Sequence, residues 1–275
     1  MSIWSSPPAS PGRRGEQEVK GPSLLAHQYR FDQKQFWREP ASVFFTVALP
    51  VIFLFLFASV FGNDTIRANG HVIKQTTYEV PAIVTLAVVS ATIVNLAITF
   101  TILREKGLLK RVRSTPLPPW VYLAGRVLTA IVVSVLLVVI LIGIGRVVYG
   151  VTLPVHTLPG LVLTLAVGTA ACCALGFALT AVIPSENAAP AVVNAVILPL
   201  YFFSGVFIPD NSLPSGMKFI GSLFPVRHLF QAFLTVFDPN TKGAGIAWGH
   251  LAVLAVWGMV GGVIASRTFR WTPRG

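Results

Sequence analysis

The residues best suited to chemical contacts lie in one short charged stretch, Leu103–Pro119, between two long apolar runs. It reads LREKGLLKRVRSTPLPP, with one glutamate and five basic residues. A charged loop between two membrane spans cannot enter hydrocarbon, so it must lie at one face of the bilayer. Glu105 and the basic cluster suit charge-assisted contacts with a soluble partner protein. The alternative is a topological role, in which the basic residues contact anionic lipid headgroups.

The other reactive residue types form no recognisable catalytic or metal site. The five histidines are scattered without HExxH spacing, and the chain contains no Gly-Lys pair, so it has no GxxxxGK[ST] phosphate loop. None of the ten acidic residues lies in the middle of an apolar run, which disfavours an ion-coupled transporter, although backbone carbonyls could bind an ion. Cys172 and Cys173 are adjacent in an apolar run and are interpreted as packing residues. We therefore expect no catalytic residue, metal or cofactor in this chain.

The composition indicates a membrane protein with essentially no soluble domain. Of the 275 residues, 54% are hydrophobic and only 11% are charged, whereas a soluble domain is typically about 25% charged. The formal net charge of +11 is typical of basic residues that flank membrane spans on the cytoplasmic side. No basic patch is interleaved with aromatic residues on a polar scaffold, so nucleic acid is not an expected partner.

The apolar runs predict an all-α integral membrane protein with six transmembrane helices in a domain over 40–266. A disordered cytoplasmic tail over 1–22 and an amphipathic interfacial helix over 23–39 precede this domain, and a cytoplasmic tail over 267–275 follows it. The segment Asp210–Gly245 is half apolar, but its pieces are too short to cross, so they are predicted to be interfacial or re-entrant helices. The six predicted spans are 41–61, 80–103, 121–145, 158–183, 188–208 and 246–266.

The distribution of basic residues predicts the orientation of the chain. With the N-terminus inside, the inner side holds 15 Lys/Arg and the outer side holds 6. This bias follows the positive-inside rule, and an even number of spans places both termini in the cytoplasm. The Leu103–Pro119 loop is then cytoplasmic, and Asp210–Gly245 is external.

Polar and aromatic residues in two spans are candidates for the translocation path or the seam of a dimer. In the second span, Asn95 and Thr99 belong to a polar set that also suits interhelical hydrogen bonds. In and after the fifth span the candidates form a mostly aromatic, apolar surface suited to a hydrophobic or amphipathic cargo. They are Asn194, Tyr201, Phe202, Phe203 and Phe207. The alternative is that these aromatics pack internally or lie at the headgroup belt.

The order of these features resembles the permease subunit of a type-2 ATP-binding-cassette exporter. The Arg104-Glu105-Lys106-Gly107 segment, followed by Arg113-Ser114-Thr115-Pro116, resembles the pattern of that family between the second and third spans. The Ser204–Pro209 segment (SGVFIP), with Leu213-Pro214 and Pro225, resembles its external re-entrant region. The chain is most similar to bacterial drug and antibiotic efflux permeases of the daunorubicin-resistance type, and the resemblance extends over nearly all residues after Leu24.

The resemblance implies a permease dimer, of identical or different chains, in a bacterial-type inner membrane. Two separate ATP-binding-cassette ATPase chains would bind ATP and Mg²⁺, and the interfacial helix would also contact them. A short cytoplasmic coupling helix would transmit their movement, and it maps to about Arg104–Lys110, with Ser114–Pro119 as the turn into the third span. The implied coupling residues are Arg104, Glu105, Lys106, Gly107, Lys110, Arg111 and Arg113.

Three alternatives remain open from the sequence. Relatives that export polysaccharide or glycolipid are the main alternative to a drug, lipid or natural-product cargo. An ion-coupled carrier or channel is a second alternative, and a membrane-embedded enzyme or scaffold is a third.

Overall fold

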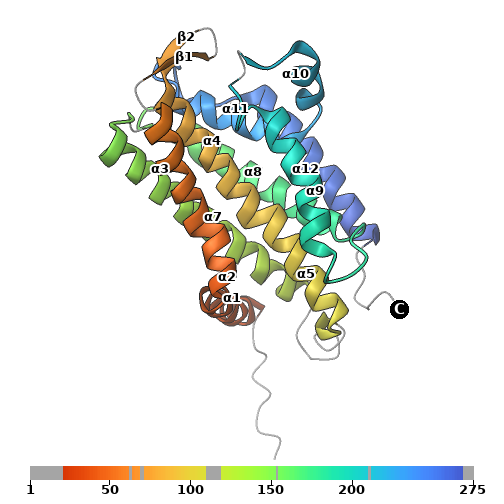
Figure 1. The fold of residues 1–275 in the computed structure, drawn as a ribbon. Coiled ribbons are helices and arrows are strands. Elements are labelled where there is room, and N and C mark those ends of the chain that lie inside the picture. Colours follow the sequence, from red (N-terminus) through yellow and green to blue (C-terminus); the bar gives the residue numbers. More distant parts are fainter. Residues whose placement is uncertain are drawn as a thin grey trace, which may run out of the picture.

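Helices run between the two ends of a bundle, and a further helix lies across one of these ends (Figure 1). The computed structural model describes residues 21–61, 64–68, 71–109, 119–152, 154–209 and 212–268. The predicted tails therefore lie almost entirely outside the described residues. The crosswise helix is α1 (Gly21–Arg38), which is the predicted amphipathic segment. It lies at the same end of the bundle as the last residues of α5 (Figure 1).

The first run after α1 contains a wide helical turn next to a proline. It consists of α2 (Pro40–Val43), the π-helix η1 (Phe44–Ala48) and α3 (Leu49–Phe61). The N–H of Leu49 donates to the carbonyl of Phe44, five residues earlier. Pro50 follows directly, and a proline inside a regular α-helix lacks a donor and collides with the preceding turn. The π turn accommodates the proline, because it widens the helix at that position.

The segment between the first two predicted spans contains two short strands. Strands β1 (Thr65–Ala68) and β2 (His71–Lys74) form an antiparallel hairpin. The all-α prediction missed this hairpin, which is a small addition to a mostly helical chain. Helix α4 (Gln75–Val89) then begins five residues earlier than the predicted span, so Glu79 lies in a helix. The run continues through the π-helix η2 (Ser90–Val94) into α5 (Asn95–Glu105).

Helix α4 forms the centre of the core, because all of its residues are buried and it packs against α3, α7 and α11. The threonines of this run bond mainly within their own helix, although Thr92 also makes an interhelical hydrogen bond with the thiol of Cys172 in α8. The hydroxyls of Thr85, Thr92 and Thr101 each donate to the carbonyl four residues earlier in their own helix. Such local bonds satisfy a hydroxyl inside an apolar helix without a partner from another helix.

The remaining helices start and end close to their predicted positions. Helix α9 stops at Ser204, four residues before the predicted end of its span, because Gly205 adopts φ +91° and turns the chain. Helices α10 and α11 meet at 97°, in the segment predicted to be too short to cross directly. The bounds are α7 (Pro119–Tyr149), α8 (Leu158–Leu179), α9 (Ala189–Ser204), α10 (Ser215–Ser222), α11 (Pro225–Phe237) and α12 (Trp248–Thr268).

Four of the described helical runs are long and apolar enough to cross a membrane, and a fifth is added if the bent α10–α11 pair counts as one span. Phe44–Val60 and α9 are apolar but shorter. A multi-pass membrane protein is therefore confirmed, whereas six crossings stay a prediction. The four long runs are Gln75–Glu105, Val121–Tyr149, Leu158–Leu179 and Trp248–Thr268.

Small residues allow α8 to approach α12 and η2 closely. A Cβ added to Gly261 of α12 would lie 3.0 Å from the backbone nitrogen of Leu175 in α8. A Cβ added to Gly176 of α8 would lie 3.1 Å from Cα of Ile93 in η2. A side chain larger than that of glycine would therefore press on the neighbouring backbone at both positions.

Candidate functional site

The candidate coupling segment is described from Leu103 to Leu109, at the end of α5. Helix α5 ends at Glu105, and Gly107 adopts φ +67°, a left-handed conformation that glycine allows. Lys110, Arg111, Arg113 and most of the predicted turn into the third span lie outside the described residues. The exposed part of the described segment is therefore short.

Arg104 is buried, although it is a charged residue at the end of a helix. Its side chain is 3% exposed, and its Nη1 and Nη2 donate to the carbonyls of Thr180 (3.0 Å) and Ile183 (2.9 Å). These carbonyls belong to the turn that follows α8, where the last carbonyls of a helix lack intrahelical partners. A guanidinium is favourable there, because it neutralises the negative end of the helix dipole. Arg104 thus joins the tip of α5 to the turn between α8 and α9.

Glu105 forms an ion pair with the guanidinium of Arg104. Its Oε1 accepts a hydrogen bond from Nε of Arg104 at 2.8 Å, and its side chain keeps 15% of its surface exposed. The next residue, Lys106, is exposed, as is Leu108, whereas Leu109 is fully buried against α5 and α7. A soluble partner would therefore meet Glu105, Lys106 and Leu108. The buried side chains of Arg104 and Leu109 fix the segment to the rest of the bundle.

Helix α1 is fixed to α7 by a buried ion pair. Asp32 of α1 is fully buried, and its Oδ1 lies 3.2 Å from Nε of Arg126 in α7. Gln28 donates to the same oxygen at 3.0 Å, and Nη2 of Arg126 donates to Gln35 at 2.9 Å. Gly125 permits the close approach, because a Cβ there would lie 2.8 Å from Cγ of Gln28.

Burial, the charge of Arg126 and the hydrogen bond from Gln28 together determine the protonation of Asp32. Burial raises the pKa of its carboxyl above the ordinary value, because a buried charge loses its hydration. The positive charge of Arg126 and the hydrogen bond from Gln28 oppose this rise in pKa. Oδ2 of Asp32 is buried and makes no hydrogen bond among the described residues. Sequence reasoning missed Asp32, although a lone acid in an amphipathic helix facing a basic residue in a span was an available signal.

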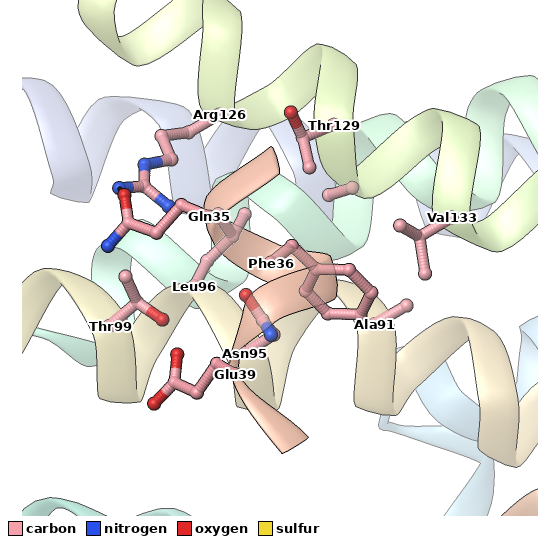
Figure 2. Close-up of a pocket in the computed structure, with 11 residues that line it drawn as sticks. Gln35, Phe36, Glu39, Ala91, Asn95, Leu96, Thr99, Arg126, Thr129 and Val133 are labelled. Atoms are coloured by element: carbon pink, nitrogen blue, oxygen red, sulfur yellow. Dashed lines mark hydrogen bonds between the residues drawn. The ribbon is translucent and has the colours of Figure 1, made fainter. Parts of the chain in front are cut away.

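A polar pocket lies between α1, α5 and α7, beside the Asp32–Arg126 pair (Figure 2). Two of the predicted path residues, Asn95 and Thr99, line it together with Arg126, Gln35 and Glu39. Asn95 directly follows η2, so the π turn sets the direction of its side chain. The cavity volume is about 40 Å³, well below the range of about 300–1,000 Å³ typical of small-molecule sites. It has room for water in this conformation but not for a drug-sized cargo.

The other predicted path residues lie elsewhere. Asn194 is exposed on α9, and Phe203 is half-buried near the end of that helix. The rings of Tyr201 and Phe202 lie 5.7 and 5.3 Å from the ring of Phe207. Tyr201 is buried, and its hydroxyl donates to the carbonyl of Leu86 at 3.3 Å. The structure therefore separates the predicted residues into Asn95 and Thr99 near α1 and an aromatic group of Tyr201, Phe202 and Phe207. Asn194 and Phe203 belong to neither group.

No cluster of three or more His, Cys, Asp or Glu side chains suited to a metal is present among the described residues. Cys172 and Cys173 are buried free thiols. His228 and His250 form a further pair of titratable side chains, whose Nδ1 atoms lie 2.9 Å apart. Nε2 of His228 lies 2.8 Å from the carbonyl of Ser222, so this nitrogen is the donor in a neutral ring.

Comparison with known proteins agrees with this architecture. The sequence profile described as ABC-2 type transporter matches residues 28–237. The protein named "Putative transport permease YvfS" from Bacillus subtilis (strain 168) is 22% identical over 241 residues. The match covers 86% of this chain and 94% of that protein. The profile match extends from the middle of α1 to the end of α11, so it includes the segment around Arg104.

Proposed function

We propose that the chain is the permease of an ATP-driven exporter, because it belongs to the ABC-2 type transporter family. A member of this family is a membrane permease that has no ATPase site of its own and works with an ATP-binding-cassette ATPase. Two permease chains form the path for a hydrophobic or amphipathic cargo across a bacterial-type inner membrane. The end of the bundle with α1 and the α5 tip faces the cytoplasm, with both chain termini. Movement of the ATPase pair enters the permease at this end.

The observation that best supports this proposal is the bonding of Arg104. An ATPase that pushes on Glu105, Lys106 or Leu108 moves the end of α5, and the buried guanidinium transmits the displacement to Thr180 and Ile183. These carbonyls lie in the turn between α8 and α9. One push therefore displaces both the loop after α5 and the turn before α9, at the same end of the bundle. The buried Asp32–Arg126 pair supports a similar transmission from α1 to α7.

The surface of α9 supports the proposal of a permease dimer. Asn194 is exposed on this apolar helix, on the same face as the exposed side chains of Leu198 and Phe202, which follow at intervals of four residues. An amide facing lipid loses its hydrogen bonds, whereas a second permease chain can satisfy it. We therefore place the dimer seam along α9.

The decisive experiment is transport by the permease reconstituted with its ATPase. Proteoliposomes with both chains should expel the membrane-partitioning dyes Nile red and ethidium on addition of ATP and Mg²⁺. An ATPase variant that binds but does not hydrolyse ATP is the control, and it should support at most a single turnover. Flux without ATP that collapses with an ionophore would instead favour an ion-coupled carrier. ATP-driven movement of a lipid-linked saccharide, with no dye export, would favour a polysaccharide or glycolipid cargo.

A further inference from the structure

A second cavity lies at the opposite end of the bundle from the α5 tip, between α3, β1, the start of α4 and the segment after α9. Its volume is about 520 Å³, within the range of about 300–1,000 Å³ typical of small-molecule sites. One part of its wall is apolar and the other part is polar. The apolar residues are Phe57, Ile66, Val206, Phe207 and Pro209, and the polar residues are Asp64, Thr65, Gln75, Glu79 and Ser212.

Glu79 is the unusual member of this wall. It is 7% exposed, and Nε2 of Gln75 donates to its Oε1 at 2.7 Å. No other hydrogen bond or ion pair reaches its carboxylate from the described residues, and no described lysine or arginine side chain lines the cavity. Among the other buried charged side chains described, Asp32 and Arg104 have an opposite charge beside them. Asp238 instead accepts two hydrogen bonds from Asn240. A buried carboxylate without a counter-charge takes up either a proton or a cation, so a cation that enters this cavity stabilises the ionised form of Glu79.

The aromatic wall suits the body of such a cation. The rings of Phe57 and Phe207 lie 6.3 Å apart, on α3 and on the segment after α9. Phe faces attract organic cations through the ring quadrupole and also bury apolar surface. Asp64, which is exposed, adds a second carboxylate to the lining.

The wall of this cavity is held in place by the core. The hydroxyl of Tyr78, which is buried in α4, donates to the carbonyl of Gly205. Gly205 begins the turn that carries Val206 and Phe207 to the cavity. Glu79 follows Tyr78 directly in α4, so one helix positions both the carboxylate and the facing segment.

We propose that this cavity is an outer binding site for a hydrophobic organic cation, with Glu79 as its counter-ion and Phe57 and Phe207 as its ring contacts. The proposal rests on the proposed function and deepens it, since it assigns a charge to the cargo. The site lies where cargo leaves the path if the opposite end faces the cytoplasm. A cation bound there neutralises the buried carboxylate until it escapes to the outer side.

The test compares two probes of nearly the same shape and opposite charge, tetraphenylphosphonium and tetraphenylborate. Equilibrium binding of each labelled ion is measured on the full-length permease in lipid nanodiscs, without ATP, after subtraction of binding to empty nanodiscs. Wild type should bind tetraphenylphosphonium in preference to tetraphenylborate. Glu79→Gln, which keeps the shape and a hydrogen bond with Gln75, should weaken tetraphenylphosphonium binding at least about tenfold, as for the loss of one desolvated ion pair.

Asp238→Asn is the matched control, because Asp238 is also a buried acid outside this cavity, and its carboxylate accepts hydrogen bonds from Asn240. It makes the same change of charge and should leave binding unchanged. Phe207→Leu provides a second test if Glu79→Gln does not fold. It should weaken binding of the cation while preserving the preference for the positively charged probe. Equal binding by wild type and Glu79→Gln, no preference between the two ions, or displacement of the probe by Mg²⁺ would overturn the proposal.

These outcomes are separate from those for the proposed function. Binding that depends on Glu79, with no ATP-driven transport, would contradict the exporter and leave the cation site standing. ATP-driven export with no charge-selective binding would contradict the cation site alone.

Discussion

Arg104 and Ile183 lie 79 residues apart in the chain and are joined by a hydrogen bond of 2.9 Å from Nη2 to the carbonyl oxygen. The same guanidinium reaches Thr180 and Glu105, so one buried side chain joins the end of α5 to the turn after α8. This connection makes the α5 tip a mechanical part of the bundle. The first two predictions concern the residues that form it.

Arg104→Lys should reduce both stability and transport, although it keeps the positive charge. An ammonium group cannot span two carbonyls and a carboxylate as the planar guanidinium does. Loss of charged hydrogen bonds typically costs about 1.5–3 kcal/mol each. Thermal unfolding can be followed with a thiol-reactive fluorophore, because Cys172 and Cys173 are the only cysteines and both are buried. Arg146→Lys is the control, since Arg146 is exposed at the other end of α7, and equal effects of the two changes would contradict the prediction.

Glu105→Lys should uncouple ATP hydrolysis from transport while leaving membrane insertion intact. The new charge would face the guanidinium of Arg104 and also reverse the charge offered to the ATPase. The quantity to measure is the cargo moved per ATP hydrolysed, and unchanged coupling in this variant would remove the role given to Glu105. Glu105→Gln retains an acceptor for Arg104 and should have a smaller effect, which separates charge reversal from loss of the hydrogen bond.

Asp32→Asn should change how stability depends on pH. Burial raises the pKa of the Asp32 carboxyl above its ordinary value of 3.8, so the folded chain binds this proton more tightly than the unfolded chain. The resulting stabilisation is complete below the pKa that Asp32 has in the unfolded chain. It is lost as pH rises through the pKa that Asp32 has in the folded chain. As pH rises above about 4, wild type should therefore lose stability relative to Asp32→Asn.

The matched control for this experiment is Glu39→Gln, because Glu39 is an exposed acid that follows α1. It should leave the wild-type pH profile almost unchanged. Melting temperatures from the thiol assay at several pH values provide the measurement. A difference between wild type and Asp32→Asn that stays constant with pH, or that grows in favour of wild type as pH rises, would show that burial does not dominate at Asp32.

Gly261→Val should destabilise the bundle, whereas Gly262→Val should not. A Cβ at Gly261 would lie 3.0 Å from a backbone atom of α8, which cannot move aside cheaply, and Gly262 has nothing within 4 Å. Overpacking of this kind typically costs about 1–3 kcal/mol. The pair is matched in residue type and helix, so the difference between their unfolding temperatures isolates the α8–α12 contact. Similar temperatures for the two variants would contradict this packing.

Much of the fold follows from local sequence. Uncharged apolar runs must form helices in a membrane, because unpaired backbone groups are too costly in hydrocarbon. Prolines and glycines then mark the ends, as Pro40 and Gly205 do at α2 and α9. The hairpin before α4 escaped prediction, because two strands of four residues give too short a signal for alternation to be recognised.

The roles of individual charges depended on tertiary structure. The sequence by itself determined that Arg104 and Glu105 lie at the end of a membrane helix, and it predicted a surface for a partner. Only the folded chain decided that Arg104 points inward to Thr180 and Ile183, and that Glu79 is buried in a cavity wall. The physical reason is that membrane insertion depends on local hydropathy, whereas the partner of a polar group depends on which distant segments pack beside it. No local sequence pattern indicates which distant segments pack beside a given polar group.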